Sequence, residues 1–224
     1  MKAYVIHLER AITRREQVEK IRASLPLALE IVPAVDGAAL TPELFRARYR
    51  RTLLQPYYPF ELRAGEIGCF LSHRKCWEMI AAGDDVDIDA GLFSQMLPFV
   101  ESWSGEESYV RFPVKAGREA GPVMHKEGEL ALFSPATPGL GTQGQYVGRK
   151  AALALLKASE LFDRPIDSFL QMRFHHHVSI LSTSPMVMEE ISADIGNSLI
   201  QTKDKSLSEK LSREILRPIY RWRI

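Results

Sequence analysis

The chain has 224 residues, of which 46% are hydrophobic and 25% charged, and its formal net charge is +1. This length suits one generous domain whose core needs no disulfide or structural metal. The balanced charge excludes general electrostatic binding to nucleic acid, and no stretch approaches the ~18 apolar residues of a membrane-spanning helix.

The ends of the chain and its cysteines set further expectations. The N-terminal stretch becomes charged too soon for a signal peptide. Cys69 and Cys76 would lie two turns apart on a helix, roughly 10 Å by helical rise, which is too far for a disulfide. We therefore expect a cytosolic protein with reduced thiols.

The first predicted elements alternate as strand, helix and strand. Residues 4–8 form an apolar, β-favouring run. Thr13 to Glu16 has the pattern of a capping box that begins a helix. Residues 30–35 form a second apolar run, which ends at the turn signal Asp36-Gly37. This order is typical of a βαβ unit and an α/β fold.

Further helices are predicted at four places. Thr41-Pro42 is typical of a helix start, and residues 66–82 contain the best helical apolar stripe, ending before Gly83. Glu66 and His73 are seven positions apart and therefore share one face. The other predicted elements are helices at 92–100 and 148–158, strands at 109–114 and 129–133, and an extended buried segment at 178–190.

An acidic cluster is the sharpest local signal. Four aspartates lie between positions 84 and 89. Hard divalent cations prefer carboxylate oxygens, and Mg²⁺ is usually held by one or two of them plus substrate phosphates. A cation here would stabilise a departing diphosphate. The alternative is a solvated acidic turn followed by a helix cap at Asp89.

Two other clusters are less specific. His175, His176 and His177 are consecutive, and adjacent side chains point in different directions, which favours a turn or strand end over a metal site. Residues 201–224 are basic and amphipathic, interrupted by Pro218. Such a helix can lie on an anionic membrane surface or pack on its own domain. We expect one domain over 1–200 and a C-terminal helix or tail over 201–224.

Several blocks, in this order, resemble glycosyltransferase family 25, the lipo-oligosaccharide biosynthesis and procollagen galactosyltransferase group. They span nearly the whole chain. The blocks are residues 2–10, residues 65–73 with Trp77, Asp84-Asp85-Val86, Gly141-Thr142 with Tyr146, Pro165-Ile166-Asp167, and Asn197-Ser198.

The resemblance implies a GT-A-like α/β fold, with a central mixed, mostly parallel sheet flanked by helices. It implies an inverting enzyme that takes a hexose, often galactose, from a UDP-sugar with Mn²⁺ or Mg²⁺ as cofactor. The acceptor would be a bacterial surface glycan or glycolipid such as lipopolysaccharide. The enzyme would be cytoplasmic, with the C-terminal helix as a peripheral contact to the inner membrane.

The resemblance also implies roles for individual residues. Asp84 and Asp85 would hold the cation. Asp167 is the candidate base that deprotonates the acceptor hydroxyl, with Glu66 as the second candidate. The implied donor-binding residues are Leu8, Arg10, Asp36, Gly37, Ser72, His73, Thr142 and Tyr146.

The chain departs from the family pattern before the acidic motif. The family has an apolar strand ending in glutamate, whereas here Ile80-Ala81-Ala82-Gly83 leads directly into Asp84. If residues are missing between Gly83 and Asp84, the distance between their Cα atoms should differ greatly from the ~3.8 Å across a trans peptide. With a normal bond, the alternative is a degenerate, non-catalytic relative that binds nucleotide or glycan. A third hypothesis, a metal-dependent hydrolase, requires the histidines and Asp85 to converge.

Overall fold

The computed structural model describes residues 2–25, 27–82, 91–114 and 120–188, together with 215–216, 218–220 and 223.

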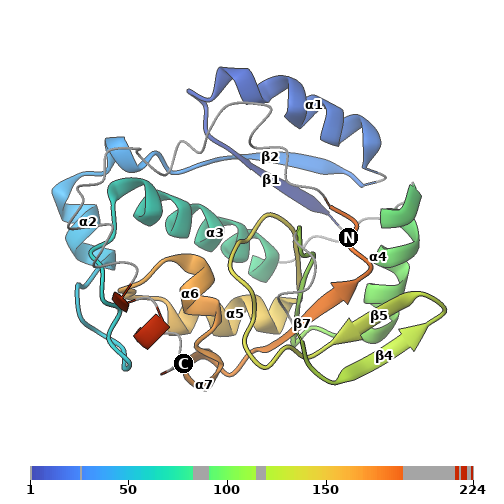
Figure 1. Ribbon diagram of the computed structural model, residues 1–224. Helices are drawn as coiled ribbons and strands as arrows, with labels where there is room; N and C mark the ends of the chain where they lie inside the picture. Colours follow the sequence, from blue (N-terminus) through green and yellow to red (C-terminus); the bar gives the residue numbers. More distant parts are fainter. Residues whose placement is uncertain are drawn as a thin grey trace.

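The first unit of the fold is a parallel βαβ motif. β1 (Ala3–His7) pairs in parallel with β2 (Leu29–Pro33), and α1 (Arg15–Ser24) connects them. Figure 1 shows the two strands between α1 above and α3 (Ala64–Ala82) below. The strand–helix–strand order predicted for the first 37 residues is confirmed.

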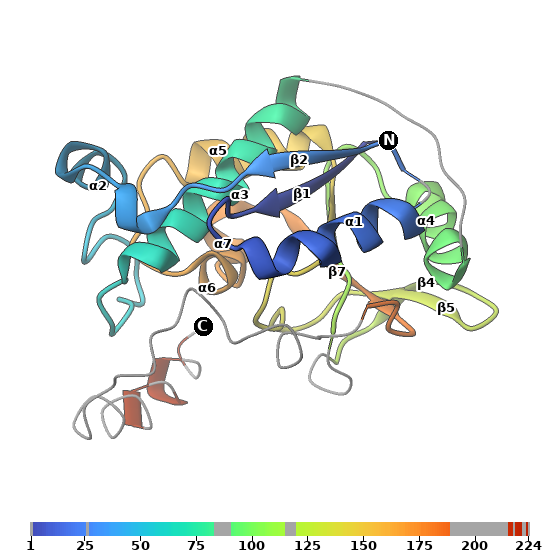
Figure 2. The ribbon, with the colours of Figure 1, turned by 90° about the horizontal axis from the view of Figure 1, so that it is seen from above.

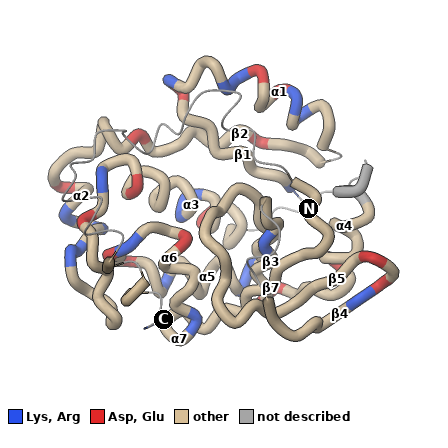
Figure 3. The backbone as a smooth tube through the Cα atoms, viewed as in Figure 1, with Lys and Arg blue, Asp and Glu red and all other residues tan. Residues whose placement is uncertain are grey.

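Helix α1 begins later than the predicted capping box. A 3₁₀ turn, η1 (Ile12–Arg14), precedes it, and its N-cap residue Arg14 makes no side-chain capping bond. Because Thr13 lies inside this turn, it does not cap the helix, and the capping-box prediction was wrong. Charges of both signs interleave along α1 (Figure 3), as in the Lys20–Glu16 pair at 2.8 Å, which is typical of a solvent-facing helix.

The next helices follow the predicted signals. In α2 (Pro42–Arg48), Thr41 Oγ1 accepts a hydrogen bond from the Leu44 N–H at 3.3 Å, and Pro42 occupies the first position. Helix α3 starts two residues before the predicted 66 and ends at the predicted Ala82. None of the described helices is long and apolar enough to span a membrane.

A second sheet contains five strands in the order β4-β5-β7-β3-β6. Among them β3 and β7 pair in parallel, and the other three pairs are antiparallel. The strands are β3 (Ser108–Arg111), β4 (Val123–Glu127), β5 (Leu130–Phe133), β6 (Gln145–Val147) and β7 (Ser179–Ser184).

This arrangement corrects the expectation of a mostly parallel central sheet. The two parallel pairs belong to different sheets. Two residues, Gly128 and Glu129, connect β4 to β5, and so short a connection permits only an antiparallel hairpin. Gly128 has a φ of +57°, which suits the tight turn.

Helices cover both faces of the five-stranded sheet. On one face, α4 (Gly91–Trp103) packs Phe99 and Val100 against the sheet residues Val110 and Leu181. On the other face, α3, α5 (Arg149–Ala158) and α6 (Ile166–Leu170) form the larger core. Figure 2, seen from above, places α4 at the end of the molecule near the N terminus. The α/β class, with helices flanking a mixed sheet, is confirmed and is consistent with a GT-A-like fold.

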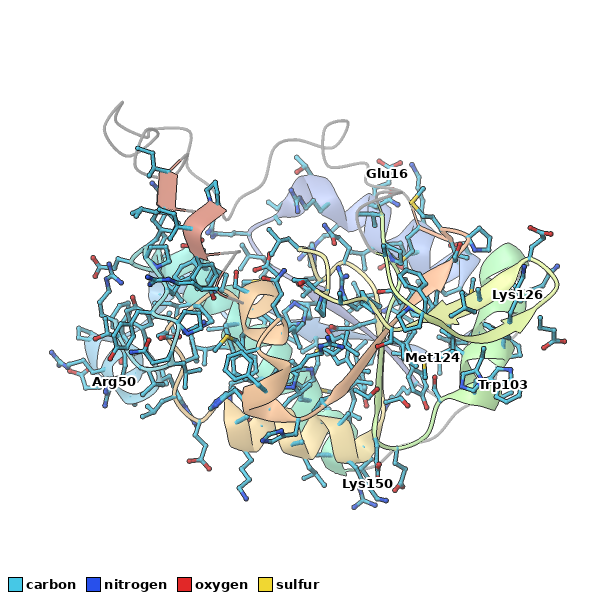
Figure 4. The ribbon with its side chains drawn as sticks, turned by 60° about the horizontal axis from the view of Figure 1, so that its bottom comes forward. Glu16, Arg50, Trp103, Met124, Lys126 and Lys150 are labelled. Atoms are coloured by element: carbon cyan, nitrogen blue, oxygen red, sulfur yellow. The ribbon has the colours of Figure 1, made fainter. Side chains whose placement is uncertain are left out.

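Strand β4 is one of the elements that the sequence analysis missed. All but one of its five residues are exposed, so the strand lacks the apolar alternation that identifies a half-buried strand. Figure 4 labels Met124 and Lys126 on this strand and Trp103 at the end of α4. The Trp103 ring stacks on His125, with ring centroids 4.3 Å apart.

The acidic cluster lies outside the described residues. Helix α3 ends at Ala82 and α4 begins at Gly91, and residues 83–90 between them are not described. The predicted Gly83–Asp84 join and the Asp89 cap therefore stay predictions. Within the described residues, β1 pairs with β2 alone.

Candidate functional site

The turn after β2 packs tightly on the start of α3. A Cβ built on Gly37 would lie 2.0 Å from the Ala64 carbonyl oxygen, and one on Gly68 would lie 2.5 Å from the Val35 carbonyl oxygen. Only glycine permits such close backbone approach. Ser72 adds a direct link: its hydroxyl accepts from the Val35 N–H at 2.8 Å and donates to the Gly68 carbonyl at 2.7 Å. Gly37 and Ser72, predicted to bind the donor, thus join β2 to α3.

Arg10 and Asp36 meet where the two parallel strands end. The Arg10 guanidinium donates to both Asp36 carboxylate oxygens, at 2.6 and 3.2 Å. Asp36 also accepts the Ala38 N–H at 3.0 Å, and the Leu8 carbonyl accepts the Ala11 N–H at 2.8 Å. The Arg10 hydrogen bond holds the Asp36 pKa below its usual value. Ligands of α/β folds bind at such carboxyl edges.

Glu66 is oriented by the start of its own helix. Its Oε2 accepts the Arg63 N–H at 2.8 Å, in the manner of a third-position glutamate that reaches back to the residue before the helix. This hydrogen bond fixes the orientation of the Glu66 carboxylate and therefore the position of its second oxygen, Oε1. Glu66 is half-buried on the side of α3 that contains Cys69.

His73, two turns further along α3, is buried. Its Nε2 lies 3.1 Å from Thr142 Oγ1, and its Nδ1 lies 3.0 Å from Gln145 Nε2. Burial lowers the pKa of His73 to about 4, so the ring is neutral at pH 7. His73 and Thr142, two of the implied donor-binding residues 69 positions apart, are therefore in contact.

Thr142 belongs to a glycine-rich loop that is anchored on two sides. The buried Arg111 on β3 donates to the carbonyls of Leu140 and Gly141, at 3.4 and 3.0 Å. From α6, Asp167 Oδ2 accepts the Gly141 N–H at 3.3 Å. Gly141 has a φ of +96°, a conformation that suits glycine and bends the loop between its two anchors.

Asp167 completes a group of polar residues around this loop. Its Oδ1 accepts the Ser168 N–H at 2.7 Å, and the carboxylate is half-buried. Burial raises the pKa of the Cys69 thiol to about 11, and the charges of Asp167 and Glu66 raise it further. Both candidate carboxylates therefore lie within electrostatic reach of Cys69, on the same side of α3.

Tyr146 lies on the opposite face of the sheet. It is next to Gln145 in β6, and successive side chains of a strand point to opposite faces. Gln145 contacts His73, whereas Tyr146 packs in the core beneath α4. Tyr146, predicted to bind the donor, thus lies on the other face of the sheet from His73 and Thr142.

The predicted metal ligands Asp84 and Asp85 lie outside the described residues, as do Asn197 and Ser198. Within the described part of the chain, no three His, Cys, Asp or Glu side chains are grouped to hold a metal ion. In the histidine triplet, His175 Nε2 lies 3.1 Å from the Ala158 carbonyl, and His176 Nε2 lies 3.1 Å from that of Leu170.

Three residues of this site were not predicted from the sequence: Tyr109, Arg111 and Gln145. Tyr109 and Arg111 are two positions apart on β3 and therefore share the face toward α3. The Tyr109 hydroxyl donates to Gln145 Oε1. Their partners are more than 25 positions away in the sequence. Period-two alternation along β3 and β6 is the only sequence signal that could have indicated their shared face.

Comparison with known proteins gives a consistent result. The family model for glycosyltransferase family 25 (LPS biosynthesis protein) matches residues 1–88. A "Glycosyltransferase 25 family member" of Drosophila melanogaster is 28% identical over 191 residues, covering 78% of this chain and 31% of that protein. "Procollagen galactosyltransferase 1" of Danio rerio is 26% identical over 197 residues, with coverages of 78% and 31%.

A human protein named "Inactive glycosyltransferase 25 family member 3" is 28% identical over 194 residues, covering 78% of this chain and 32% of that protein. The chain thus spans about a third of the length of these curated relatives. Residues 1–88 are thus similar to the glycosyltransferase family 25 model, and 78% of the sequence aligns with relatives that carry the name of that family or of a procollagen galactosyltransferase.

Proposed function

We propose that this chain is an inverting, metal-dependent glycosyltransferase that moves a hexose from a UDP-sugar to a hydroxyl of a glycan. One observation supports this most: the Asp167 carboxylate, the neutral His73 ring and the Thr142 hydroxyl meet at one glycine-rich loop. The Glu66 carboxylate, like that of Asp167, acts on the nearby Cys69 thiol. Galactose is proposed from the name of the zebrafish relative, and a lipopolysaccharide-type acceptor from the description of the family model.

The reaction is a single displacement. The acceptor hydroxyl oxygen attacks the anomeric carbon from the face opposite the leaving group. The bond from that carbon to the diphosphate oxygen breaks, and a carboxylate takes the hydroxyl proton. Asp167 is the first candidate because the Gly141 and Ser168 N–H groups fix its orientation. Glu66, with one oxygen bound to the Arg63 N–H, is the second.

The proposed cation ligands are Asp84 and Asp85. Two adjacent carboxylates suit Mn²⁺ or Mg²⁺, and a bound cation would supply positive charge for the departing diphosphate. Arg10 would contribute a guanidinium at the carboxyl edge of β1, where Asp36 orients it through two hydrogen bonds.

The proposed setting is the cytoplasmic side of a bacterial inner membrane. Residues 201–224 hold seven Lys or Arg residues against three acidic ones, and a basic amphipathic segment favours an anionic lipid surface. Co-sedimentation with anionic vesicles, compared between the full chain and a 1–200 variant, tests this part separately.

The enzyme proposal is tested by measuring UDP release from UDP-galactose with Mn²⁺ and a panel of glycan acceptors. We expect acceptor-dependent release, and a fall in kcat of roughly 10²–10⁴ in Asp167→Asn with an unchanged fold. Glu160→Gln, an exposed carboxylate on another surface, is the matched control and should retain full turnover. Full activity in Asp167→Asn would exclude it as the base.

A second candidate function is non-catalytic binding of nucleotide or glycan. The human relative whose name includes "inactive" favours this alternative. It predicts that UDP binds while no acceptor supports release of UDP above the rate of the Asp167→Asn variant.

A further inference from the structure

We propose that Gln145, held by Tyr109, is a positioning residue. Through His73 it orients the Thr142 hydroxyl so that its hydrogen is donated to an oxygen of the nucleotide-sugar. This inference rests on the proposed function for the identity of the ligand. The arrangement of the four side chains itself does not depend on that function.

Tyr109, Gln145, His73 and Thr142 form a series of hydrogen bonds, and the donor–acceptor direction of this series is fixed at Gln145. The Tyr109 hydroxyl donates to Gln145 Oε1, so the amide nitrogen Nε2 is the atom that faces His73. An amide nitrogen only donates. His73 Nδ1, 3.0 Å away, must therefore accept this bond.

His73 transmits this direction to the loop. A neutral imidazole has one N–H, and because Nδ1 accepts, the proton resides on Nε2. Nε2–H then donates to Thr142 Oγ1 at 3.1 Å. The neutral form agrees with the burial of His73, which lowers its pKa to about 4.

Thr142 is the last residue of this hydrogen-bond series and lies at the candidate site. Its oxygen already accepts from His73, so its own hydrogen is left to donate. Among the described residues no acceptor meets this hydrogen, and Thr142 is half-buried on the loop that Arg111 and Asp167 anchor. A hydroxyl oriented in this way suits an anionic or sugar oxygen of the donor substrate.

The same hydrogen-bond series explains why an uncharged residue occupies position 145. A carboxylate there would accept from both neighbours and would draw a proton onto His73 Nδ1. The ring would then become the other tautomer or an imidazolium. As the other tautomer it would accept from Thr142, and the hydroxyl would point its hydrogen at His73 rather than at the ligand.

Gln145→Glu tests the proposal, with Gln143→Glu, an exposed glutamine of the same loop, as the matched control. Two-dimensional ¹⁵N–¹H spectra of the histidine rings, with His73 assigned from a His73→Gln sample, report the tautomer. We expect Nε2–H in the wild type and in Gln143→Glu between pH 5 and 8, and a proton on Nδ1 in Gln145→Glu. A wild-type ring that has its proton on Nδ1, or titrates near 6.5, overturns the inference.

The ligand is tested separately by the Kd for UDP-galactose. Losing one hydrogen bond to a charged group should weaken binding roughly ten- to a hundred-fold in Thr142→Val. Gln145→Glu should weaken it similarly, but have no further effect in the Thr142→Val background. Additive losses would contradict an action through Thr142. Absence of UDP-galactose binding in the wild type, with the Nε2–H tautomer intact, would instead refute the proposed function.

Discussion

Arg164 is the residue whose loss should most destabilise the described fold. Its guanidinium and the Asp163 carboxylate are both fully buried, with Nε 2.7 Å from Oδ1. Arg164 also donates to the Leu54 carbonyl and to the Tyr220 hydroxyl, each at 2.7 Å. It therefore ties together the segment before α3, the start of α6 and a residue near the C terminus.

Arg164→Met removes the cation and leaves its partners in place. The Asp163 carboxylate would keep the N–H groups of Leu53 and Leu54, at 3.0 and 2.9 Å, but no opposite charge. Breaking a buried pair by removing one partner costs about 3–5 kcal/mol. With a urea m-value of about 2 kcal/mol/M, the unfolding midpoint should fall by roughly 1.5–2.5 M.

The assay is urea unfolding followed by circular dichroism, with Lys20→Met as the control. Lys20 pairs with Glu16 on the exposed surface of α1, so its loss should cost less than about 1 kcal/mol. Asp163→Asn combined with Arg164→Met removes both charges and should recover part of the loss. A cost for Arg164→Met no greater than that of Lys20→Met would refute the reasoning.

Two further predictions concern acid stability and backbone contact. Burial lowers the pKa of His73 and His176 from 6.5 to about 4, so between these pH values the unfolded chain binds protons that the folded chain does not. Stability should fall by up to about 3 kcal/mol per histidine as the pH drops from 6.5 to 4, and urea unfolding of His176→Gln should show a shallower pH dependence. Gly37→Ala should destabilise by about 1–3 kcal/mol, because its Cβ would meet the Ala64 carbonyl oxygen. Gly105→Ala, with open space around its Cβ, should change the midpoint little, and equal effects of the two substitutions would contradict the close contact.

Local sequence signals predicted the N-terminal half of the fold well. The apolar stripe of α3, the Thr41 cap and the turn at Gly37 each depend on neighbouring residues, so a short window contains the information. Strand β4 was missed because most of its side chains are exposed and give no alternation.

The site was only partly predictable, because its contacts join distant segments. The resemblance indicated His73, Thr142 and Asp167, which the fold brings to one loop. The position of Tyr146 on the opposite face could not be predicted, because the register of β6, which nothing in the sequence specifies, decides which of its residues face α3.

Two of the implied donor-binding residues make contacts within the fold. Ser72 and Gly37 join the turn after β2 to α3 through a hydrogen bond and a backbone contact. The buried pair Asp163–Arg164 has no local pattern, since most of its other partners, such as Leu54 and Tyr220, lie more than 50 positions away in the sequence.

Titration calorimetry with UDP and UDP-galactose, with and without Mn²⁺, addresses the central claim that this loop and the carboxyl edge of β1 form a nucleotide-sugar site. We predict one binding site per chain and a lower Kd when Mn²⁺ is present. No heat from either nucleotide under any metal condition, with the protein folded, would contradict it.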